Sequence, residues 1–273
     1  MTLPTSPPAS PENRLARIDA ARRAVMHGES AGRSAVEPWI ERSWRRCLDS
    51  GQRPEHKVAF DAVSGPLLRR TLESNRDLVE AARPVLATLG RAIASTRYFA
   101  ILTNAAGVVV DVNGPIDRTD RRATLIARVG VDLSEASVGT TAIGAALIER
   151  SPVWLHRGEH FFNDTSVYSC AGAPLFGPHG QCVGMLDLTG IDAVERPELR
   201  HLVVRSARSI ENALTLRQPH HLLMRINWPG SAFGDESDGL IGLDADGWVT
   251  GANPTANQLV PQLVALARER IHS

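Results

Sequence analysis

The segment from residue 138 to residue 190 restricts the possible folds of this chain more than any other part of the sequence. It closes with two apolar runs, 169–176 and 181–189, joined by the sequence Gly-Pro-His-Gly at 177–180. Two apolar runs on either side of a short Gly- and Pro-containing segment predict an antiparallel hairpin. A two-stranded hairpin is not stable alone in water, so other parts of the chain must cover it.

A second pair of apolar runs lies upstream, at 98–103 and 108–112, around the turn sequence Asn-Ala-Ala-Gly. Both runs are apolar at consecutive positions, which is typical of strands covered on both faces. Apolar residues at helical spacing predict helices at 140–150 and 197–217, and a short strand is predicted at 153–155. Strands and helices in this order favour an α+β fold, in which helices flank an antiparallel sheet.

Helical spacing dominates the first third of the chain. The Pro- and Ser-rich residues 1–12 are expected to form a disordered tail, and an N-terminal helical region follows at 13–83. Its helices are predicted at 13–27, 37–50 and 64–83. Pro84 lacks a backbone donor and crowds the preceding turn, so we expect a break or kink there and a new helix that starts at Pro84.

The third predicted helix carries a possible coiled-coil seam. Its positions are spaced by four, three, four and three residues: Leu68, Leu72, Asn75, Val79 and Ala82. A single Asn in such a seam fixes the register and the oligomeric state. Two interpretations stay open, a helix packed on its own domain and a parallel dimer helix that carries a signal.

Three basic residues, Arg42, Arg45 and Arg46, lie off the apolar stripe of the second predicted helix. A DNA-contacting helix and a packed helix with a solvated basic face both fit this pattern. The packed helix is favoured, because the next segment is extended whereas a helix-turn-helix needs a second helix placed by a tight turn. The chain has 30 basic and 30 acidic residues, which gives no argument for nucleic acid. Direct DNA binding by this chain is not expected.

Past residue 217 the pattern changes again. Residues 218–238 are interrupted by prolines and are expected to be a linker. Two short strands are predicted at 239–244 and 248–252, followed by a helix that Asn253 caps and a last helix at 263–271. A hairpin and two short helices cannot bury a core alone.

Candidate catalytic and metal sites are few. His156 and His160 are separated by three residues, a spacing that places two imidazoles on one face of a helix, but the intervening Arg-Gly-Glu is loop-like. Cys170 begins an apolar strand, where a free cysteine usually acts as a small buried hydrophobe. Neither a phosphate-binding G-x-x-x-x-G-K-[ST] loop nor a G-x-S-x-G elbow occurs. We expect no catalytic residue, no metal, no cofactor and no enzymatic activity.

The three cysteines, Cys47, Cys170 and Cys182, are an odd number and form no C-x-x-C pair. This favours free thiols in a reducing compartment over a disulfide framework. No apolar run approaches the ~20 residues that cross a bilayer. We therefore expect a cytoplasmic protein that does not bind membranes.

Five short motifs occur in a characteristic order: WRRC at 44–47, VGTTAIG at 138–144, EHF at 159–161, CAGAP at 170–174 and GMLDLTG at 184–190. Together they resemble the N-terminal sensory region of acetoin-catabolism-type regulators, which are sigma-54-dependent bacterial transcriptional activators. Residues 84–217 resemble a GAF domain, and 239–259 resemble the opening of a PAS domain, so 239–273 is expected to be an incomplete PAS-like segment.

The resemblance implies a signal-sensing regulatory module whose GAF domain binds a small metabolite. In that family an ATPase domain and a DNA-binding helix-turn-helix follow, and this sequence contains neither. Two interpretations stay open, a truncated regulator and a stand-alone sensor that acts through a separate output protein. A homodimer is expected through the 68–82 seam and the helix at 197–217. The candidate lining residues of the pocket are Trp154, Glu159, His160, Phe161, Tyr168 and Cys170. Glu159 and His160 would orient a polar effector such as a small hydroxyketone or diol, between aromatic walls.

Two other functions stay open. The first is a Cys-dependent reductase on the same fold, with Cys170 as its nucleophile. The second is a structural dimerisation adaptor whose GAF core is filled and has no pocket.

Overall fold

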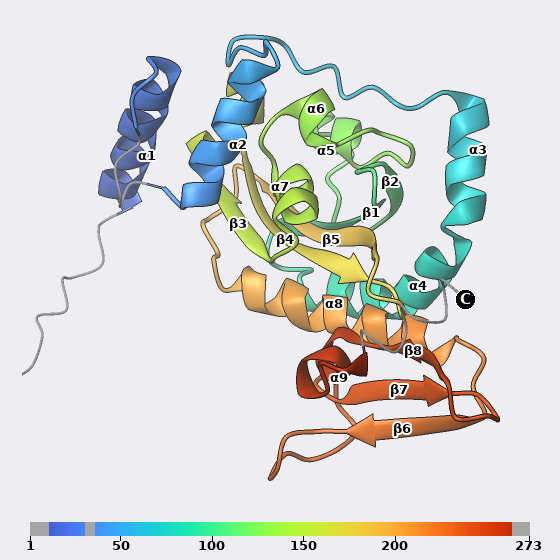
Figure 1. Cartoon of the computed structure of the whole chain (residues 1–273). Coiled ribbons are helices and arrows are strands. Elements are labelled where there is room, and N and C mark those ends of the chain that lie inside the picture. Colours follow the sequence, from blue (N-terminus) through green and yellow to red (C-terminus); the bar gives the residue numbers. More distant parts are fainter. Residues whose placement is uncertain (1–10, 31–35, 264–273) are drawn as a thin grey trace, which may run out of the picture.

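The computed structural model describes residues 11–30 and 36–263. Its centre is an antiparallel sheet of five strands in the order β2-β1-β5-β4-β3 (Figure 1). The strands are β1 (Tyr98–Asn104), β2 (Val109–Asn113), β3 (Val153–His156), β4 (Tyr168–Phe176) and β5 (Cys182–Ile191). Both predicted hairpins are confirmed, since β1 pairs with β2 and β4 pairs with β5. The β1–β5 pairing joins the two hairpins into one sheet.

Helices cover both faces of this sheet. One face packs on α4 (Arg76–Ala92) and α8 (Leu199–Leu216), and the other packs on α5 (Arg121–Ile126), α6 (Glu135–Val138) and α7 (Ala142–Glu149). Successive side chains of a strand point to opposite faces. On β5, Leu186 and Leu188 therefore join the core against α8, and Met185 joins the core against α7. The predicted α+β fold with a flanked antiparallel sheet is confirmed.

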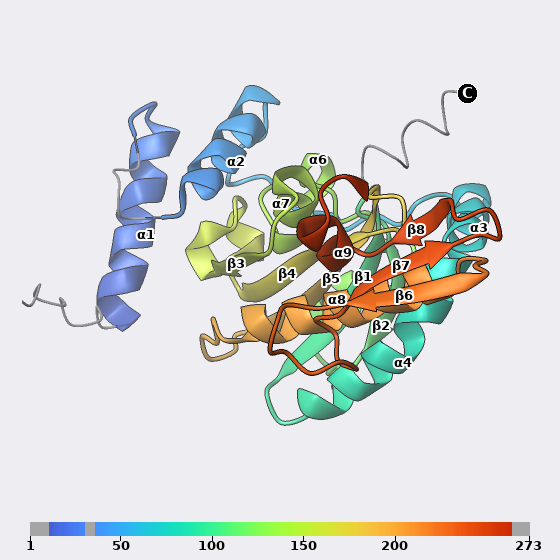
Figure 2. The ribbon, with the colours of Figure 1, turned by 60° about the horizontal axis from the view of Figure 1, so that its bottom comes forward.

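Two N-terminal helices lie beside the β3 edge of the sheet, α1 (Pro11–Met26) and α2 (Pro38–Asp49) (Figures 1 and 2). They face two short 3₁₀ turns, η1 (Arg157–Glu159) and η2 (Asn163–Thr165). The fully buried Trp44 of α2 packs here with Phe161 and Phe162. Of the tail predicted at 1–12, residues 11 and 12 belong to α1, and the others lie outside the described residues.

The predicted break at Pro84 is wrong. Helix α4 continues through Pro84, and the chain breaks earlier, between α3 (Gly65–Ser74) and α4. Asn75 stands at this junction, and its side-chain amide donates to the carbonyl of Thr71 at 2.7 Å. The Asn thus ends a helix instead of occupying a continuous seam. Ala82 is buried in the core against the sheet, which agrees with packing on the chain's own domain.

The C-terminal part forms a second sheet in the order β6-β7-β8, beside α8. Its elements are β6 (Leu222–Ile226), β7 (Gly239–Leu243), β8 (Val249–Ala252) and α9 (Pro254–Leu259). The strand β6 lies within the range predicted as a linker. The helix predicted at 263–271 lies outside the described residues, apart from Leu263.

Contacts with the first sheet support the second one. Asn253 caps α9, and its amide also donates to Asn212 of α8 at 2.6 Å. The backbone amide of Ala252 donates to the carbonyl of Pro178 in the β4–β5 turn at 2.8 Å. A strand pair too small to bury its own core is thus completed by β6 and by α8.

Candidate functional site

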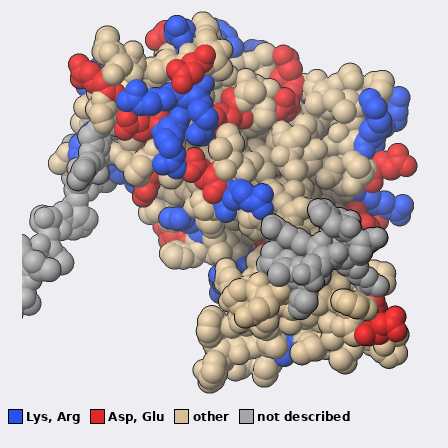
Figure 3. Space-filling model, in the orientation of Figure 1, with Lys and Arg blue, Asp and Glu red and all other residues tan. Residues whose placement is uncertain are grey.

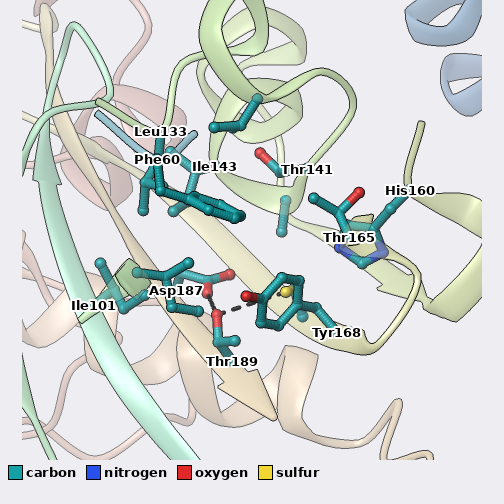
Figure 4. Close-up of a pocket in the computed structure, with 14 residues that line it drawn as sticks. Phe60, Ile101, Leu133, Thr141, Ile143, His160, Thr165, Tyr168, Asp187 and Thr189 are labelled. Atoms are coloured by element: carbon teal, nitrogen blue, oxygen red, sulfur yellow. Dashed lines mark hydrogen bonds between the residues drawn. The ribbon is translucent and has the colours of Figure 1, made fainter. Parts of the chain in front are cut away.

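A cavity lies between the central sheet and the short helices α5–α7 (Figure 4). The centre of a water-sized molecule has about 30 Å³ to occupy in it, so the cavity is small and takes only a compact guest unless its walls move. Most of its walls are apolar, with side chains contributed by the residues Phe60, Ile101, Ile126, Leu133, Val138, Ala142 and Ile143. The helices on this face are short and leave part of it uncovered, whereas the longer helices α4 and α8 cover the opposite face.

Polar side chains of β4 and β5 form one wall of the cavity, namely Asp187, Thr189 and Cys170. The hydroxyl of Thr189 donates to Asp187 Oδ2, and Cys170 Sγ lies 3.5 Å from the same hydroxyl. Asp187 is fully buried, and its Oδ1 has no hydrogen-bond partner among the described residues. Burial raises the pKa of this carboxyl to about 7, against the opposing hydrogen bond from Thr189.

His160 forms a second polar wall and is also fully buried. Its Nδ1 lies 3.0 Å from the carbonyl oxygen of Arg157, which can only accept, so Nδ1 carries the proton. The other ring nitrogen, Nε2, is then an acceptor, and within the described part of the chain nothing donates to it. Burial lowers the pKa of His160 to about 4, which keeps the ring neutral at pH 7.

The remaining hydroxyl groups of the cavity have partners. Thr141 accepts from the amide of Gly144 at 3.2 Å, and Thr165 donates to the carbonyl of Phe162 at 2.9 Å. The phenol of Tyr168 donates to the carbonyl of Arg122 at 3.3 Å. Two buried atoms of the cavity thus lack a partner among the residues that the structure describes: His160 Nε2, which accepts, and Asp187 Oδ1, which accepts when the carboxyl is ionised and donates when it carries its proton. Buried polar atoms are costly without a partner, so this cavity favours a guest that donates hydrogen bonds.

Three of the six predicted lining residues line this cavity: His160, Tyr168 and Cys170. Trp154 does not line it. On β3 the neighbours of Trp154, Val153 and Leu155, belong to the cavity-side core, and the period of two turns the indole to the opposite face, against the α4–α8 core. The sequence shows that Trp154 lies just before a loop, but it does not show which face of the sheet the indole occupies.

Glu159 and Phe161 flank His160 in sequence but do not line the cavity. Glu159 is buried and forms an ion pair with Arg14 of α1 at 3.1 Å, and it accepts from the amide of His156 at 2.6 Å. Phe161 packs against the N-terminal helices. The 3₁₀ turn η1 ends at Glu159 and the chain changes direction at His160, so the three side chains of 159–161 reach different surroundings.

Asp187 and Thr189 were not among the predicted lining residues. The signal was available, because the motif at 184–190 holds one carboxyl in a strand that is apolar and covered on both faces. A buried charged residue without a partner is rare in a strand that serves only as core.

The three thiols are free. Cys47 and Cys170 are buried, and burial raises the pKa of Cys47 to about 11 and that of Cys170 well above the ordinary thiol value. Cys182 is partly exposed at the start of β5. Cys170 is consequently a protonated thiol at pH 7, which is a poor nucleophile.

His156 and His160, the two histidines weighed above as metal ligands, have separate partners. His156 Nδ1 pairs with Ser169 at 2.7 Å, whereas His160 pairs with a backbone carbonyl. Across residues 11–30 and 36–263, no three His, Cys, Asp or Glu side chains are grouped as metal ligands would be. The same residues contain no helix that is both long and apolar enough to cross a membrane.

The arginines of α2 are engaged within the chain. Arg42 pairs with Glu149, Arg46 pairs with Glu135 at 2.7 Å, and Arg45 pairs with Glu41 along the same helix. Basic and acidic side chains lie interspersed over this end of the molecule (Figure 3). These ion pairs agree with a packed helix that has a solvated face.

Known transcriptional regulators resemble this chain over most of its length. Over 238 residues the chain is 30% identical to the acetoin catabolism regulatory protein of Cupriavidus necator, covering 84% of this chain and 35% of that protein. It is also 30% identical to MimR, the propane 2-monooxygenase operon transcriptional activator of Mycolicibacterium goodii, over 71% of this chain and 33% of that protein. The chain spans about a third of the length of these curated relatives. The predicted resemblance to acetoin-catabolism-type regulators is confirmed.

A solved structure has the same fold. The Escherichia coli DhaR(N)–DhaL complex matches with a TM-score of 0.61 at 18% identity, over 82% of this chain and 76% of that one. The match supports the GAF-like fold expected from the sequence. The family model described as the MimR N-terminal domain covers residues 18–212. With most of its length matched, this chain belongs to the MimR N-terminal domain family of transcriptional regulators.

Proposed function

We propose that this chain is a sensory module that binds a small, uncharged hydroxyl compound in the cavity beside Asp187 and His160. The observation that carries the proposal is the pair of fully buried atoms without a hydrogen-bond partner among the described residues, Asp187 Oδ1 and His160 Nε2, on residues that line the cavity. A ligand hydroxyl, which both donates and accepts, would donate to His160 Nε2 or pair with Asp187 Oδ1 in either protonation state, and the apolar walls would cover its carbon atoms. An anionic ligand would lose its hydration there without gaining an ion pair, because no Lys or Arg of the described chain lines the cavity.

The names of the relatives agree in chemistry with such a ligand. One relative regulates acetoin catabolism, and acetoin is a hydroxyketone; another activates a propane 2-monooxygenase operon. We extend only the general class, a short alcohol, diol or hydroxyketone, to this chain. In place of Glu159, which the sequence suggested, Asp187 would orient the ligand together with His160.

The two alternative functions fit less well. A Cys-dependent reductase needs a reactive thiolate, and Cys170 is buried with a raised pKa. A filled adaptor needs a closed core, and this core contains the cavity. We therefore propose a non-enzymatic role in the cytoplasm. Homodimerisation and action through a separate output protein stay predictions; the related E. coli structure, DhaR(N), was solved together with a second protein, DhaL.

A thermal-shift screen tests the proposal. The panel contains acetoin, butane-2,3-diol, propane-1,2-diol and propan-2-ol as donors, with acetone and butane-2,3-dione as matched compounds that lack a hydroxyl group. Stabilisation at a hundredfold excess over Kd is about 2.7 kcal/mol. We expect at least one donor to raise the Tm, and Asp187→Asn to abolish the shift.

Glu211→Gln is the matched control. Glu211 is also a buried carboxyl whose pKa burial raises to about 7, but it lies on α8 and accepts from the amide of Phe176 at 2.9 Å. This variant should keep the ligand-induced shift. A panel without any shift, or an equal shift in Asp187→Asn, would refute the proposed site.

A further inference from the structure

The segment 156–165 has two sides, and the cavity occupies only one of them. His160 and Thr165 line the cavity. Phe161 and Phe162, between them, pack into the cluster formed by α1 and α2. A displacement of this segment therefore changes both the cavity wall and the surface on which α1 and α2 pack.

Helix α1 is attached to the rest of the chain mainly through this segment and through α2. Arg22 of α1 donates to the carbonyl of Phe161 and, at 2.9 Å, to the side chain of Asn163. Arg14 pairs with the buried Glu159 at 3.1 Å. Ile18 lies so close to Gly158 that a Cβ atom there would stand 3.3 Å from its side chain. Arg14 and Arg22 thus attach α1 to residues that flank His160, and Arg14 also pairs with Glu195, which follows β5.

Helix α2 has a firmer attachment. Ser43 lies 2.7 Å from the hydroxyl of Thr140, and Arg46 pairs with Glu135 of α6. The indole of Trp44 donates to the carbonyl of Glu159 at 2.9 Å. In contrast, α1 stands at the edge of the molecule, away from the central sheet, in both ribbon views (Figures 1 and 2). Of the two helices, α1 has fewer ties to the sheet and is therefore easier to release.

We infer that α1 is a latch, a helix whose docking on segment 156–165 reports whether the cavity is occupied. The inference rests on the proposed function, because a ligand shifts an equilibrium only through its different affinity for the two states. A hydroxyl group bound to His160 Nε2 restrains His160, and with it the adjacent acceptors of Arg14 and Arg22. An occupied cavity therefore tightens the docking of α1, and a docked α1 tightens ligand binding by the same factor.

Hydrogen exchange of the amides in α1, measured on the whole chain, tests the latch without any ligand. Arg22→Ala should speed this exchange about tenfold, whereas Arg23→Ala, at the exposed neighbouring position, should not. His160→Ala should speed it several-fold although its side chain lies at the cavity wall. Thr165→Val, which changes the same wall more gently, serves if His160→Ala folds poorly. Unchanged exchange in α1 for both wall variants would overturn the inference.

A second arm uses butane-2,3-diol as the probe. Saturation with the diol should slow exchange in α1 several-fold, and Arg22→Ala should weaken diol binding by the factor that the linkage requires. A thermal shift without slower exchange in α1 overturns the latch and leaves the proposed function in place. A panel without any thermal shift overturns the proposed function. The exchange rates of α1 in His160→Ala and Thr165→Val then decide whether the cavity wall and α1 are coupled.

Discussion

The two faces of the central sheet are built from the same strands but perform different tasks. On β5, Leu186 and Leu188 enter a closed apolar core against α4 and α8, while Asp187 and Thr189 border the cavity on the opposite face. Long helices seal the first face and short ones cover the second. The sealed face supplies the apolar burial that folds the domain, which lets the other face hold polar groups at a cost in stability.

The largest expected effect distinguishes the faces by their packing. Leu188→Ala removes a fully buried side chain from the sealed core and should lower the free energy of unfolding by about 2–5 kcal/mol. Leu133→Ala removes the same group from the cavity wall, where part of the side chain already borders empty space, and should cost less. Urea unfolding of both variants measures the difference. Equal losses would mean that the cavity face is packed as tightly as the other.

The next effect depends on pH. The pKa of Asp187 is raised in the folded state to about 7, so between pH 4 and 7 the folded chain holds a proton that the unfolded chain has lost. Its contribution to stability is full below pH 4 and declines by about 1.4 kcal/mol per pH unit as pH rises toward 7. Asp187→Asn replaces the carboxyl by an amide that does not titrate, so this position no longer contributes to the pH dependence of stability.

The variant should therefore match the wild type near pH 4 and exceed its stability at pH 8. His160, whose pKa is lowered to about 4, changes stability in the opposite direction, and Glu211 changes it in the same direction as Asp187, but both are present in each protein. The difference between the two unfolding curves isolates Asp187. A difference that is constant with pH would show that this carboxyl is ionised throughout.

The smallest effect concerns Trp154 on the sealed face. Its indole N–H is buried without a hydrogen-bond partner among the described residues. Trp154→Phe removes that unmet donor and some ring volume, so stability should stay within about 1 kcal/mol of the wild type. The thermal shift produced by a panel alcohol should be unchanged, because this side chain faces α8. Loss of the ligand-induced thermal shift in Trp154→Phe would indicate that Trp154 contributes to the ligand site.

The elements of the fold were predictable where local pattern decides them. Two apolar hairpins and the helices at their flanks follow from periodicity, and the structure confirms them. Pro84 was misjudged because tertiary packing of α4 tolerates one missing hydrogen bond, whereas Asn75 ends α3 through a side-chain bond that no periodicity reveals. Strand β6 escaped prediction because it needs β7 as its partner.

The site was harder to predict because it depends on which way each side chain faces. His160, Tyr168 and Cys170 were predicted, since loop and strand residues near a motif converge in space. Glu159 was assigned to the ligand, but α1, more than a hundred residues away in sequence, supplies its partner Arg14. Only the arrangement of distant segments separates a carboxyl that holds a helix from one that faces a cavity.

The burial of two of the three thiols has a practical consequence for spectroscopy. Maleimides react with thiolates, and the protonated, buried Cys47 and Cys170 offer few of them at neutral pH. Partly exposed Cys182 begins β5, beside the turn whose Pro178 accepts a hydrogen bond from β8. The unmodified chain therefore behaves as a single-cysteine protein toward such dyes. A fluorophore attached there would report, without any engineered cysteine, on the junction between the central and the C-terminal sheets.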